Sequence, residues 1–260
     1  MKPLTIVLTG ATGGIGQAIA KELAAAGHRL VLLGRNAHSL ANLQQQLPGN
    51  HSCFTVDLSD EAQLQSCCEK LTALPLDALI NNAGLSWFGD IQQDADSLEQ
   101  LMAVNLIAPI RLTQNLLPTL LKSSEARIIN IGSSFGSIGY PGFSLYCASK
   151  FGLRGFTESL QRELADQAIA IHYLAPRAVN TEMNSPAVNA LNKELGNQVD
   201  EPSIVAHAVL KLIEKSQSQH HFLGWPERFF VKLNALFPSV VGKALSKQLP
   251  IIRRHFALNK

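Results

Sequence analysis

Residues 9–16 read TGATGGIG, and the fold that we expect follows from this stretch. It comes after a short apolar run and opens a helical pattern over residues 14–26. Gly10 and Gly14 let the backbone turn tightly and approach a ligand, and Gly16 lets the helix pack on the strand. Because the first N–H groups of a helix are free and its dipole is positive there, this strand–turn–helix unit is typical of a pyrophosphate site. An ordinary glycine turn is the alternative.

Short apolar runs alternate with longer helical patterns along the rest of the chain. Continuous runs of Val, Ile and Leu predict strands buried on both faces, as in a parallel sheet covered by helices. The sequence therefore predicts an α/β protein, a three-layer Rossmann-type doubly wound parallel sheet of about seven strands with a C-terminal helical extension. The expected strands are 4–10, 29–35, 53–58, 77–84, 127–133, 170–176 and 220–225, and the expected helices 14–26, 61–73, 97–122, 144–166 and 202–216.

The composition is that of an ordinary globular chain, with 46% hydrophobic and 16% charged residues. This balance excludes a disordered chain. No run of about 18 apolar residues occurs, so no membrane-spanning helix is expected. The cysteines and histidines lack ligand or redox spacing, and His220–His221 is interpreted as the start of a strand. We expect no metal, reduced thiols and a cytoplasmic protein.

The chain is expected to consist of one domain, which contains a polar segment, followed by a C-terminal extension. No linker interrupts the strand–helix pattern, so residues 1–225 are predicted to form one catalytic domain. Within it, residues 178–201 are polar with little periodicity and follow a strand's carboxyl end, so we interpret them as a mobile substrate loop. Residues 226–260 hold seven Lys or Arg against one Glu. They are predicted to form a basic amphipathic extension on or beside the same domain.

The stretch SLYCASKFGL, residues 144–153, places Tyr146 and Lys150 on one face of a predicted helix, one turn apart. An amphipathic helix with a polar edge would give the same pair, so the pair alone is a weak signal. The alternative is that the ammonium favours ionisation of the phenol. An unperturbed phenol has a pKa of about 10, and a neighbouring positive charge lowers it.

A series of motifs in order resembles the short-chain dehydrogenase/reductase (SDR) family. The resemblance covers residues 4–225 and includes the glycine stretch and the Tyr–Lys pair. The spacing of the glycines is T-G-x-x-x-G-x-G rather than G-x-G-x-x-G. The motifs are TGATGGIG, VDLSD with Asp57, NNAG (Asn81–Gly84), VNL with Asn105, IGSSFG with Ser133, YCASK with Tyr146 and Lys150, and APRAVNTEM with Pro176, Val179 and Thr181.

The resemblance implies roles for single residues. Tyr146 would exchange a proton with the substrate oxygen, Ser133 would hold that oxygen, and Lys150 with an oxidised nicotinamide would lower the phenol pKa. Asn105 would hold a water that links Lys150 to solvent. Ser134 is the rival serine, one residue off the family's interval. The implied cofactor-binding residues are Thr9, Gly10, Thr12, Gly13, Gly14, Ile15, Gly16, Arg35, Asp57, Leu58, Asn82, Ala83, Gly84, Tyr146, Lys150, Pro176, Val179 and Thr181.

Two arginines lie where they can contact the cofactor or the substrate. Gly34 stands where a carboxylate would bind the ribose hydroxyls of NAD, and Arg35 follows it. A guanidinium suits a 2′-phosphate, so NADP(H) is the preferred cofactor and NAD(H) the alternative; a solvent-facing arginine is the other interpretation. Arg177 stands where the family has a glycine. We expect it to be solvated, with contact to an anionic substrate group as the alternative.

The tail, residues 226–260, has two interpretations, and Pro238 divides its helical pattern. Its apolar face could cap the substrate side of the core or form a subunit contact. It could instead lie on the surface and meet anionic lipid or an acyl carrier protein. The apolar positions are Phe229, Leu233, Phe237, Val240 and Ala244, and the basic ones Arg228, Lys232, Lys243, Lys247, Arg253 and Arg254.

The expected function is that of an NAD(P)-dependent oxidoreductase that interconverts a ketone or aldehyde and an alcohol. We expect a reductase of an apolar substrate such as a 3-oxoacyl thioester, carried on an acyl carrier protein or coenzyme A. The alternatives are a dehydrogenase of a steroid-like or long-chain alcohol, and a non-catalytic cofactor-binding regulator or membrane-docked scaffold at the membrane periphery. The family resemblance implies that helices 97–122 and 144–166 form a dimer face, so a homodimer or homotetramer is expected. No nucleic-acid motif is present, so no nucleic-acid partner is expected.

Overall fold

The computed structural model describes residues 2–92 and 98–256. Its centre is a seven-stranded sheet in the order β3-β2-β1-β4-β5-β6-β7, and every neighbouring pair is parallel. The expected Rossmann-type α/β fold is confirmed. The strands are β1 (Thr5–Thr9), β2 (Arg29–Gly34), β3 (Ser52–Thr55), β4 (Ala78–Asn81), β5 (Ala126–Ile131), β6 (Ile169–Ala175) and β7 (Gln219–Phe222).

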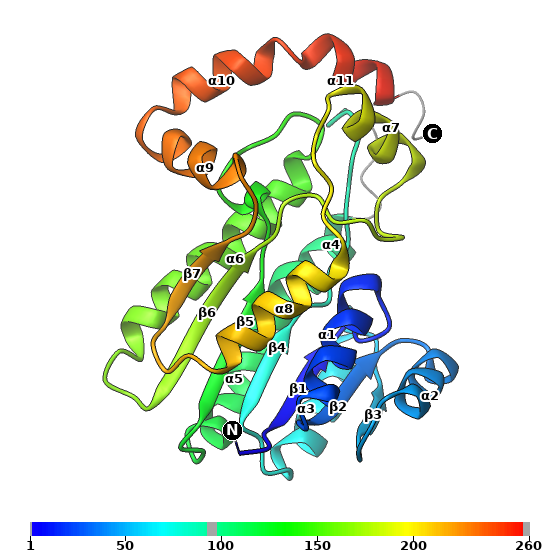
Figure 1. The fold of residues 1–260 in the computed structure, drawn as a ribbon, viewed down its shortest axis with the longest axis vertical. Helices are drawn as coiled ribbons and strands as arrows, with labels where there is room; N and C mark the ends of the chain where they lie inside the picture. Colours follow the sequence, from blue (N-terminus) through cyan, green and yellow to red (C-terminus); the bar gives the residue numbers. More distant parts are fainter. Residues whose placement is uncertain (1, 93–97, 257–260) are drawn as a thin grey trace.

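Helices cover both faces of this sheet, as Figure 1 shows. The buried side chains of α1, α2 and α8 pack in one cluster with one face, and those of α3, α5 and α6 pack in a second cluster with the other. These helices are α1 (Gly14–Ala25), α2 (Ala37–Gln46), α8 (Pro202–Ile213), α3 (Glu61–Thr72), α5 (Ala108–Leu120) and α6 (Ser144–Glu163).

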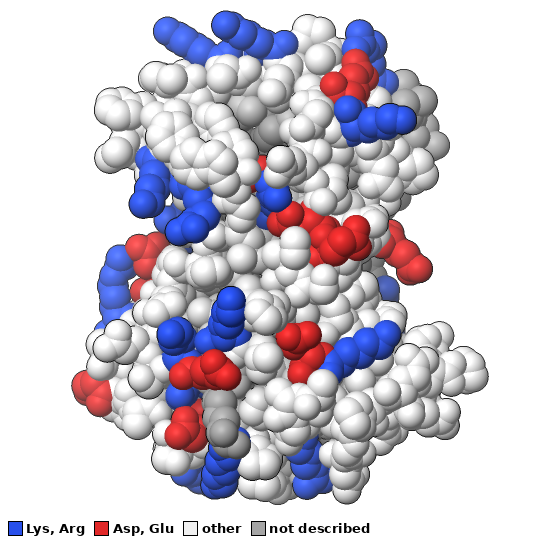
Figure 2. Space-filling view, viewed as in Figure 1, with Lys and Arg blue, Asp and Glu red and all other residues white. Residues whose placement is uncertain are grey.

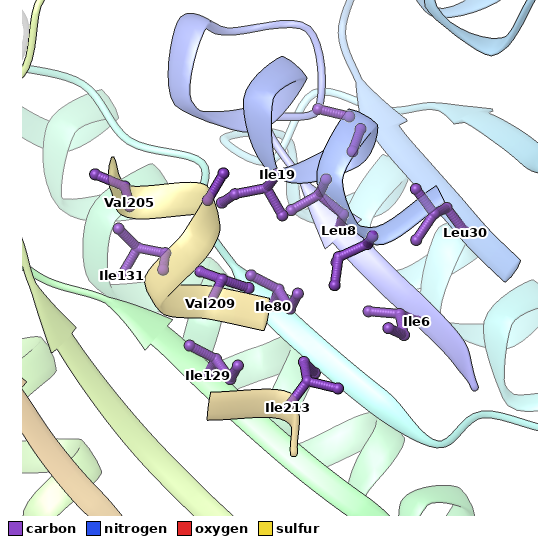
Figure 3. Close-up of a cluster of buried hydrophobic side chains, with 14 of the residues drawn as sticks. Ile6, Leu8, Ile19, Leu30, Ile80, Ile129, Ile131, Val205, Val209 and Ile213 are labelled. Atoms are coloured by element: carbon purple, nitrogen blue, oxygen red, sulfur yellow. The ribbon is translucent and has the colours of Figure 1, made fainter. Parts of the chain in front are cut away.

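The core between the sheet and α1 and α8 explains the apolar strand pattern (Figure 3). Ile6 and Leu8 alternate along β1 toward this side, while Val7 between them belongs to the opposite cluster. Ile19 of α1 and Val209 of α8 are fully buried against them. Each such side chain contributes about 1.5–3 kcal/mol through its burial, so both layers are held firmly to the sheet.

The order in which strands are added to the sheet reverses between β1 and β4. Strands β2 and β3 lie on one side of β1, and β4 to β7 follow on the other side. Such a switch point opens a crevice at the carboxyl ends of the strands, because the following helices leave to opposite faces. The glycine stretch leaves β1 there, and residues 82–85 leave β4 beside it.

Three helical segments differ from the expectation. The predicted helix 97–122 consists of α4 (Leu98–Met102), a π-helical turn (Ala103–Ile107) and α5, and residue 97 lies outside the described residues. The helix α2 was not expected. The interpretation of 178–201 as a loop is wrong in part, because α7 (Pro186–Glu194) lies within it.

The local reason for α7 is present in the sequence. The Ser185 hydroxyl accepts a hydrogen bond from the Val188 amide at 3.3 Å and caps the helix, and Pro186 occupies its first turn. Ala187, Val188 and Leu191 are buried, which gives the helix a single apolar side. The polar residues between them hide this periodicity in the sequence.

The tail forms three helices above the carboxyl ends of the strands, α9 (Glu227–Leu236), α10 (Pro238–Ser246) and α11 (Leu249–Phe256) (Figure 1). Pro238 separates α9 from α10 as predicted. Ile252 of α11 is fully buried in one cluster with residues of α7. The last four residues, 257–260, lie outside the described part of the chain.

Candidate active site

The glycine stretch forms a close-packed turn between β1 and α1. Gly10 has φ +62°, and a Cβ atom on it would lie 2.8 Å from the Cα of Ala83. A Cβ on Gly16 would overlap the carbonyl oxygen of Gly10, so the helix meets the turn at a distance that only glycine allows. Around Gly13, in contrast, the nearest atom to such a Cβ is 3.6 Å away.

The first turn of α1 has no side-chain cap on its amides. Its N–H groups are therefore available to an anion, which the positive end of the helix dipole also favours. The cleft in front of this turn has a volume of about 250 Å³. Among its lining residues are Gly10, Thr12, Gly13, Gly14, Ile15, Gly16, Arg35, Asp57, Leu58, Asn82, Ala83, Gly84 and Thr181.

These residues fit a dinucleotide. A Cβ on Gly14 would lie 2.9 Å from the Cγ2 of Thr181, so only a bare backbone leaves space between turn and loop. The amides at one end suit a pyrophosphate, and Arg35 and Asp57 at another part of the lining suit a ribose or its phosphate. The cleft thus combines backbone donors for a pyrophosphate with a cation and a carboxylate elsewhere on its lining.

Thr9 does not line this cleft. It is buried, and its hydroxyl accepts hydrogen bonds from the amides of Asn82 and Ala83, both at 2.9 Å. The Asn82 amide side chain donates back to the carbonyl of Thr9 at 3.0 Å. Thr9 therefore joins the turn after β1 to the segment after β4. Its contact with a cofactor stays a prediction.

Asp57 is held as a carboxylate. Its Oδ1 accepts from the Ser59 hydroxyl at 2.7 Å and from the Ser59 amide at 2.9 Å. These bonds lower the pKa of Asp57, and the nearby charge of Arg35 lowers it further. Arg35 itself is exposed at the end of β2. Its guanidinium is therefore free to move toward a phosphate on the rim.

A second cavity of about 130 Å³ continues the first. The two share six lining residues, Ile15, Asn82, Gly84, Leu85, Thr181 and Met183. The second cavity brings together Ser133, Tyr146 and Lys150, with Pro176 and Val179 on its wall. Residues from β5, α6 and β6 thus converge at one end of a single cleft whose other end faces the glycine turn.

Tyr146 and Lys150 lie close together on the first turns of α6. The Lys150 Nζ is 5.9 Å from the centre of the Tyr146 ring and donates a hydrogen bond to the carbonyl of Ile131 at 3.0 Å. Burial lowers the pKa of Lys150 to about 8. Its charge therefore changes just above neutral pH, whereas an exposed lysine stays charged.

The pKa of the phenol is governed mainly by burial. Burial raises the pKa of Tyr146 to about 12, and a hydrogen bond with the Ser133 side chain opposes this only in part. Desolvation of the phenolate is the largest effect on this pKa. The lowering by Lys150 together with an oxidised nicotinamide stays a prediction. At neutral pH Tyr146 is a protonated phenol, which suits a proton donor.

The two candidate serines differ in position. The Ser133 hydroxyl accepts a hydrogen bond from the Phe135 amide at 3.1 Å and interacts with Tyr146. The amide of Ser134 donates to the carbonyl of Pro176 at 3.0 Å, which ties the end of β5 to the segment after β6. Both serines line the cavity, and Ser133 is the one beside the phenol.

Asn105 sits in the π-helical turn and is fully buried. Its Oδ1 accepts from the Leu85 amide at 2.7 Å, and its Nδ2 donates to the Leu85 carbonyl at 2.9 Å and to the Ser149 hydroxyl at 3.0 Å. All its polar side-chain atoms thus hold the wall after β4 against α6. The water-holding role that the resemblance implies for Asn105 stays a prediction.

Tyr173 is a residue that the sequence did not single out. Its buried ring lies against Gly132 and Gly136, where any side chain would overlap it. Its hydroxyl accepts from the Ser133 amide at 3.3 Å and donates to the Ser133 carbonyl at 3.2 Å. The two glycines in IGSSFG were the available signal, since they leave room for a large neighbour.

Arg177 is not solvated, so that expectation is wrong. Its side chain is only 13% exposed and forms ion pairs with Asp200 at 2.6 Å and with Glu227 at 3.4 Å. It also donates to Gln198 at 2.7 Å and to the Trp225 carbonyl at 3.1 Å. These acids are far away in the sequence, which is why the pairing was not foreseen. Arg177 joins the segment after β6 to the start of the tail.

Aromatic side chains form the outer wall of the second cavity. Phe135 stacks on Tyr140 with 4.8 Å between ring centres and lies 5.0 Å from Phe143. Val188 and Leu191 of α7 complete this wall. The Tyr140 hydroxyl donates to Oε1 of Gln248 in the tail at 2.9 Å. The wall is mostly apolar, and both α7 and the tail support it.

Comparisons with known proteins agree with this picture. A family model described as short chain dehydrogenase matches residues 4–192. The Xenopus tropicalis protein Dehydrogenase/reductase SDR family member 7B is 32% identical over 258 residues, covering 92% of this chain and 84% of that protein. This chain spans 64% of the length of the Mus musculus protein of the same name.

Two further likenesses concern a substrate and a cofactor. The 3-oxoacyl-(acyl-carrier-protein) reductase FabG of Rickettsia conorii is 31% identical over 222 residues, covering 82% of this chain and 90% of that protein. A solved short-chain dehydrogenase from Sphingobium yanoikuyae in complex with NADPH is 28% identical with a TM-score of 0.76, covering 93% of this chain and 95% of that chain.

A parallel doubly wound sheet with a glycine cleft at its switch point defines the Rossmann class of α/β proteins. Within that class, this chain belongs to the short chain dehydrogenase family. In the described part of the chain, no group of three or more His, Cys, Asp or Glu residues could hold a metal ion. No helix of the described residues is long and apolar enough to cross a membrane.

Proposed function

We propose that the protein is an NADP(H)-preferring reductase that converts a ketone or aldehyde of an apolar compound to an alcohol. The observation that carries this proposal is the convergence of Ser133, Tyr146 and Lys150 in one cavity that continues the glycine cleft. A regulator that only senses a cofactor would need the cleft but not this cluster. The catalytic and cofactor-binding assignments of single residues belong to this proposal.

When bound, a nicotinamide dinucleotide supplies the hydride. The chain's own part is to hold the carbonyl and to deliver a proton. The Ser133 hydroxyl donates to the carbonyl oxygen, and the Tyr146 phenol gives up its proton as that oxygen gains negative charge. Because burial raises its pKa to about 12, the phenol of the chain alone holds its proton at neutral pH. Positive charge on Lys150 stabilises the phenolate that remains.

The preference for NADP(H) is supported by Gly34 and Arg35. No acidic side chain occupies the end of β2 at these two positions, so a 2′-phosphate meets no repulsion there. The exposed guanidinium of Arg35 on the cleft lining can pair with that phosphate. The solved relative from Sphingobium yanoikuyae is a complex with NADPH, which supports the same choice.

The substrate class is supported by the wall of the second cavity. Phe135, Tyr140, Phe143, Val188 and Leu191 present mostly apolar surface beside Tyr146. An acyl chain would fit such a wall, and the Rickettsia conorii relative is named for reduction of a 3-oxoacyl group on a carrier protein. We therefore infer a 3-oxoacyl thioester on an acyl carrier protein or coenzyme A as the substrate. A homodimer or homotetramer stays a prediction.

The test compares variants of Ser133, Ser134 and Tyr146 in the same assay. NADPH oxidation is measured with acetoacetyl coenzyme A and with a longer 3-oxoacyl thioester. Tyr146→Phe should abolish turnover while NADPH binding, followed by its fluorescence, stays near that of the wild type. Ser133→Ala should lower kcat about a hundredfold through loss of a donor to the oxygen.

Ser134→Ala is the matched control and should keep most of its activity. Retained turnover in Tyr146→Phe would refute the mechanism. Equal losses in the two serine variants would refute the assignment of Ser133. Turnover with NADH in place of NADPH at equal or higher kcat/KM would refute the cofactor preference. Activity only with steroid-like or long-chain alcohols would refute the substrate class.

A further inference from the structure

An exposed apolar surface lies on the first part of the tail. Six of the thirteen exposed large apolar side chains among the described residues fall between positions 225 and 240. We call this set the apolar strip. It consists of Trp225 (70% exposed), Phe229 (48%), Phe230 (42%), Leu236 (73%), Phe237 (56%) and Val240 (54%). Lone exposed apolar residues are common on proteins, but such a concentration marks an interaction surface.

The strip is held in place from behind. Val231 of α9 and Val241 of α10 are buried in one cluster with Ile138. The Asn234 side chain donates to the carbonyl of Ser137 at 2.9 Å. Buried side chains of the two helices thus pack against residues 137 and 138. The side chains of the apolar strip stay exposed beside these packed residues, and no part of the described chain covers them.

Positive charge surrounds this strip. Arg228, Lys232, Lys243 and Lys247 are exposed, and Glu227 is the one acidic residue between positions 226 and 256. Glu227 pairs inward with Arg177, so it does not neutralise them. In Figure 2 the top of the molecule, over α10, carries Lys and Arg with no Asp or Glu among them. Below it, over α9, the surface is largely uncharged.

We propose that α9 and α10 dock the protein on an anionic phospholipid surface. Exposed Trp, Phe and Leu side chains beside Lys and Arg are the chemistry of a helix that lies in the membrane interface. The apolar side chains enter the headgroup region, and the cations pair with lipid phosphates. An acidic protein partner with a polar surface would pair with the cations but would leave Leu236 and Phe237, the two neighbouring exposed apolar residues, without apolar contacts. The proposal is therefore a membrane and not a carrier protein.

The apolar strip lies close to the second cavity, so docking would bring that cavity near the membrane. The carbonyl of Trp225 accepts from Arg177, which lines the second cavity. Tyr140, on the same cavity wall, is bonded to Gln248 just beyond α10. The docked face thus borders the cavity, and an apolar substrate reaches it from the bilayer without crossing water. This inference extends the proposed function, and its test needs no turnover.

The first experiment is flotation with vesicles of phosphatidylglycerol mixed with phosphatidylcholine, compared with phosphatidylcholine alone. The wild-type protein should float with the anionic vesicles and release at high salt, because salt screens the charges. The double variant Leu236→Ser/Phe237→Ser should bind at least about tenfold more weakly, since it loses apolar area. The triple variant Lys232→Gln/Lys243→Gln/Lys247→Gln should bind about a hundredfold more weakly.

The matched control replaces exposed apolar residues by serine at positions outside the apolar strip. Leu121→Ser/Ile204→Ser removes two exposed apolar side chains outside the strip and should bind vesicles as the wild type does. Circular dichroism and NADPH binding serve for all variants as checks of folding. Because the changed side chains are exposed, each variant should retain its fold.

A second measurement places the contact. The chain has two tryptophans, Trp87 and Trp225. In Trp87→Phe, the remaining emitter lies in the strip, and its emission should shift to shorter wavelength when anionic vesicles are added. No shift together with no flotation would overturn the proposal.

Two other outcomes would also overturn it. A change of Leu236→Ser/Phe237→Ser from dimer to monomer with no vesicle binding in either protein would identify the strip as a contact between copies. Loss of turnover with a carrier-bound substrate in the lysine variant, again without vesicle binding, would identify a carrier-protein surface. Loss of NADPH oxidation alone would bear on the proposed function and not on docking.

Discussion

The hydroxyl of Tyr173 lies 3.3 Å from the amide nitrogen and 3.2 Å from the carbonyl oxygen of Ser133. A single buried side chain of β6 therefore holds both backbone groups of a residue that follows β5. Since Ser133 in turn interacts with the Tyr146 phenol, the position of the candidate proton donor and oxygen binder depends on a residue that does not line the cavity. Tyr173 is a positioning residue.

Replacing Tyr173 by Phe should lower kcat about fivefold. The ring still fills the space beside Gly132 and Gly136, but the loss of its hydroxyl frees the Ser133 backbone at a cost of about 1 kcal/mol. Binding of NADPH and the pH dependence of kcat should not change, because Tyr146 and Lys150 remain. A kcat equal to that of the wild type would show that Ser133 is held without Tyr173.

Replacing Lys150 by Met should abolish turnover and change how stability depends on pH. Burial lowers the pKa of Lys150 from 10.5 to about 8, so the unfolded chain binds more protons between these values. The stability of the wild type therefore rises relative to that of Lys150→Met as pH rises from about 8 to 10.5. Denaturant unfolding at both pH values measures this. A pH-independent difference would contradict the burial of the ammonium.

Replacing His172 by Leu should remove part of the acid sensitivity of the fold. His172 is fully buried, which lowers its pKa from 6.5 to about 4. Protonation thus favours the unfolded chain, and the wild type loses stability as pH falls from 6.5 toward 4, by about 2 kcal/mol between pH 6.5 and 5. The variant should lose correspondingly less over the same interval.

Replacing Arg177 by Met should destabilise the protein by about 3–5 kcal/mol, because it leaves the buried carboxylate of Asp200 without its partner. Arg162→Met, which breaks the exposed pair with Glu158, should cost less than about 1 kcal/mol. Urea unfolding of both variants measures the contrast. Similar small losses in the two would mean that Asp200 is well solvated when Arg177 is absent.

Much of this molecule follows from local sequence. The apolar runs predict the strands because the five inner strands are largely buried on both faces. The edge strands β3 and β7 are only partly buried, and the observed ends of all seven differ from the expected ones by at most three residues. Gly10 and Gly16 mark the turn after β1 because a Cβ atom at either position would overlap neighbouring backbone. Motifs of this kind encode short-range geometry, so they can be recognised without the fold.

The remaining features depend on contacts between distant parts of the chain. Arg177 meets Asp200 and Glu227, and Tyr173 meets Ser133, only because the sheet brings these segments together. The pKa of Tyr146 is raised because burial, a property of the whole packed structure, disfavours the phenolate more than the hydrogen bond with Ser133 favours it. Local order along the sequence thus determines the elements and the candidate site, while packing alone determines the protonation, the partners and the exposed strip of the tail.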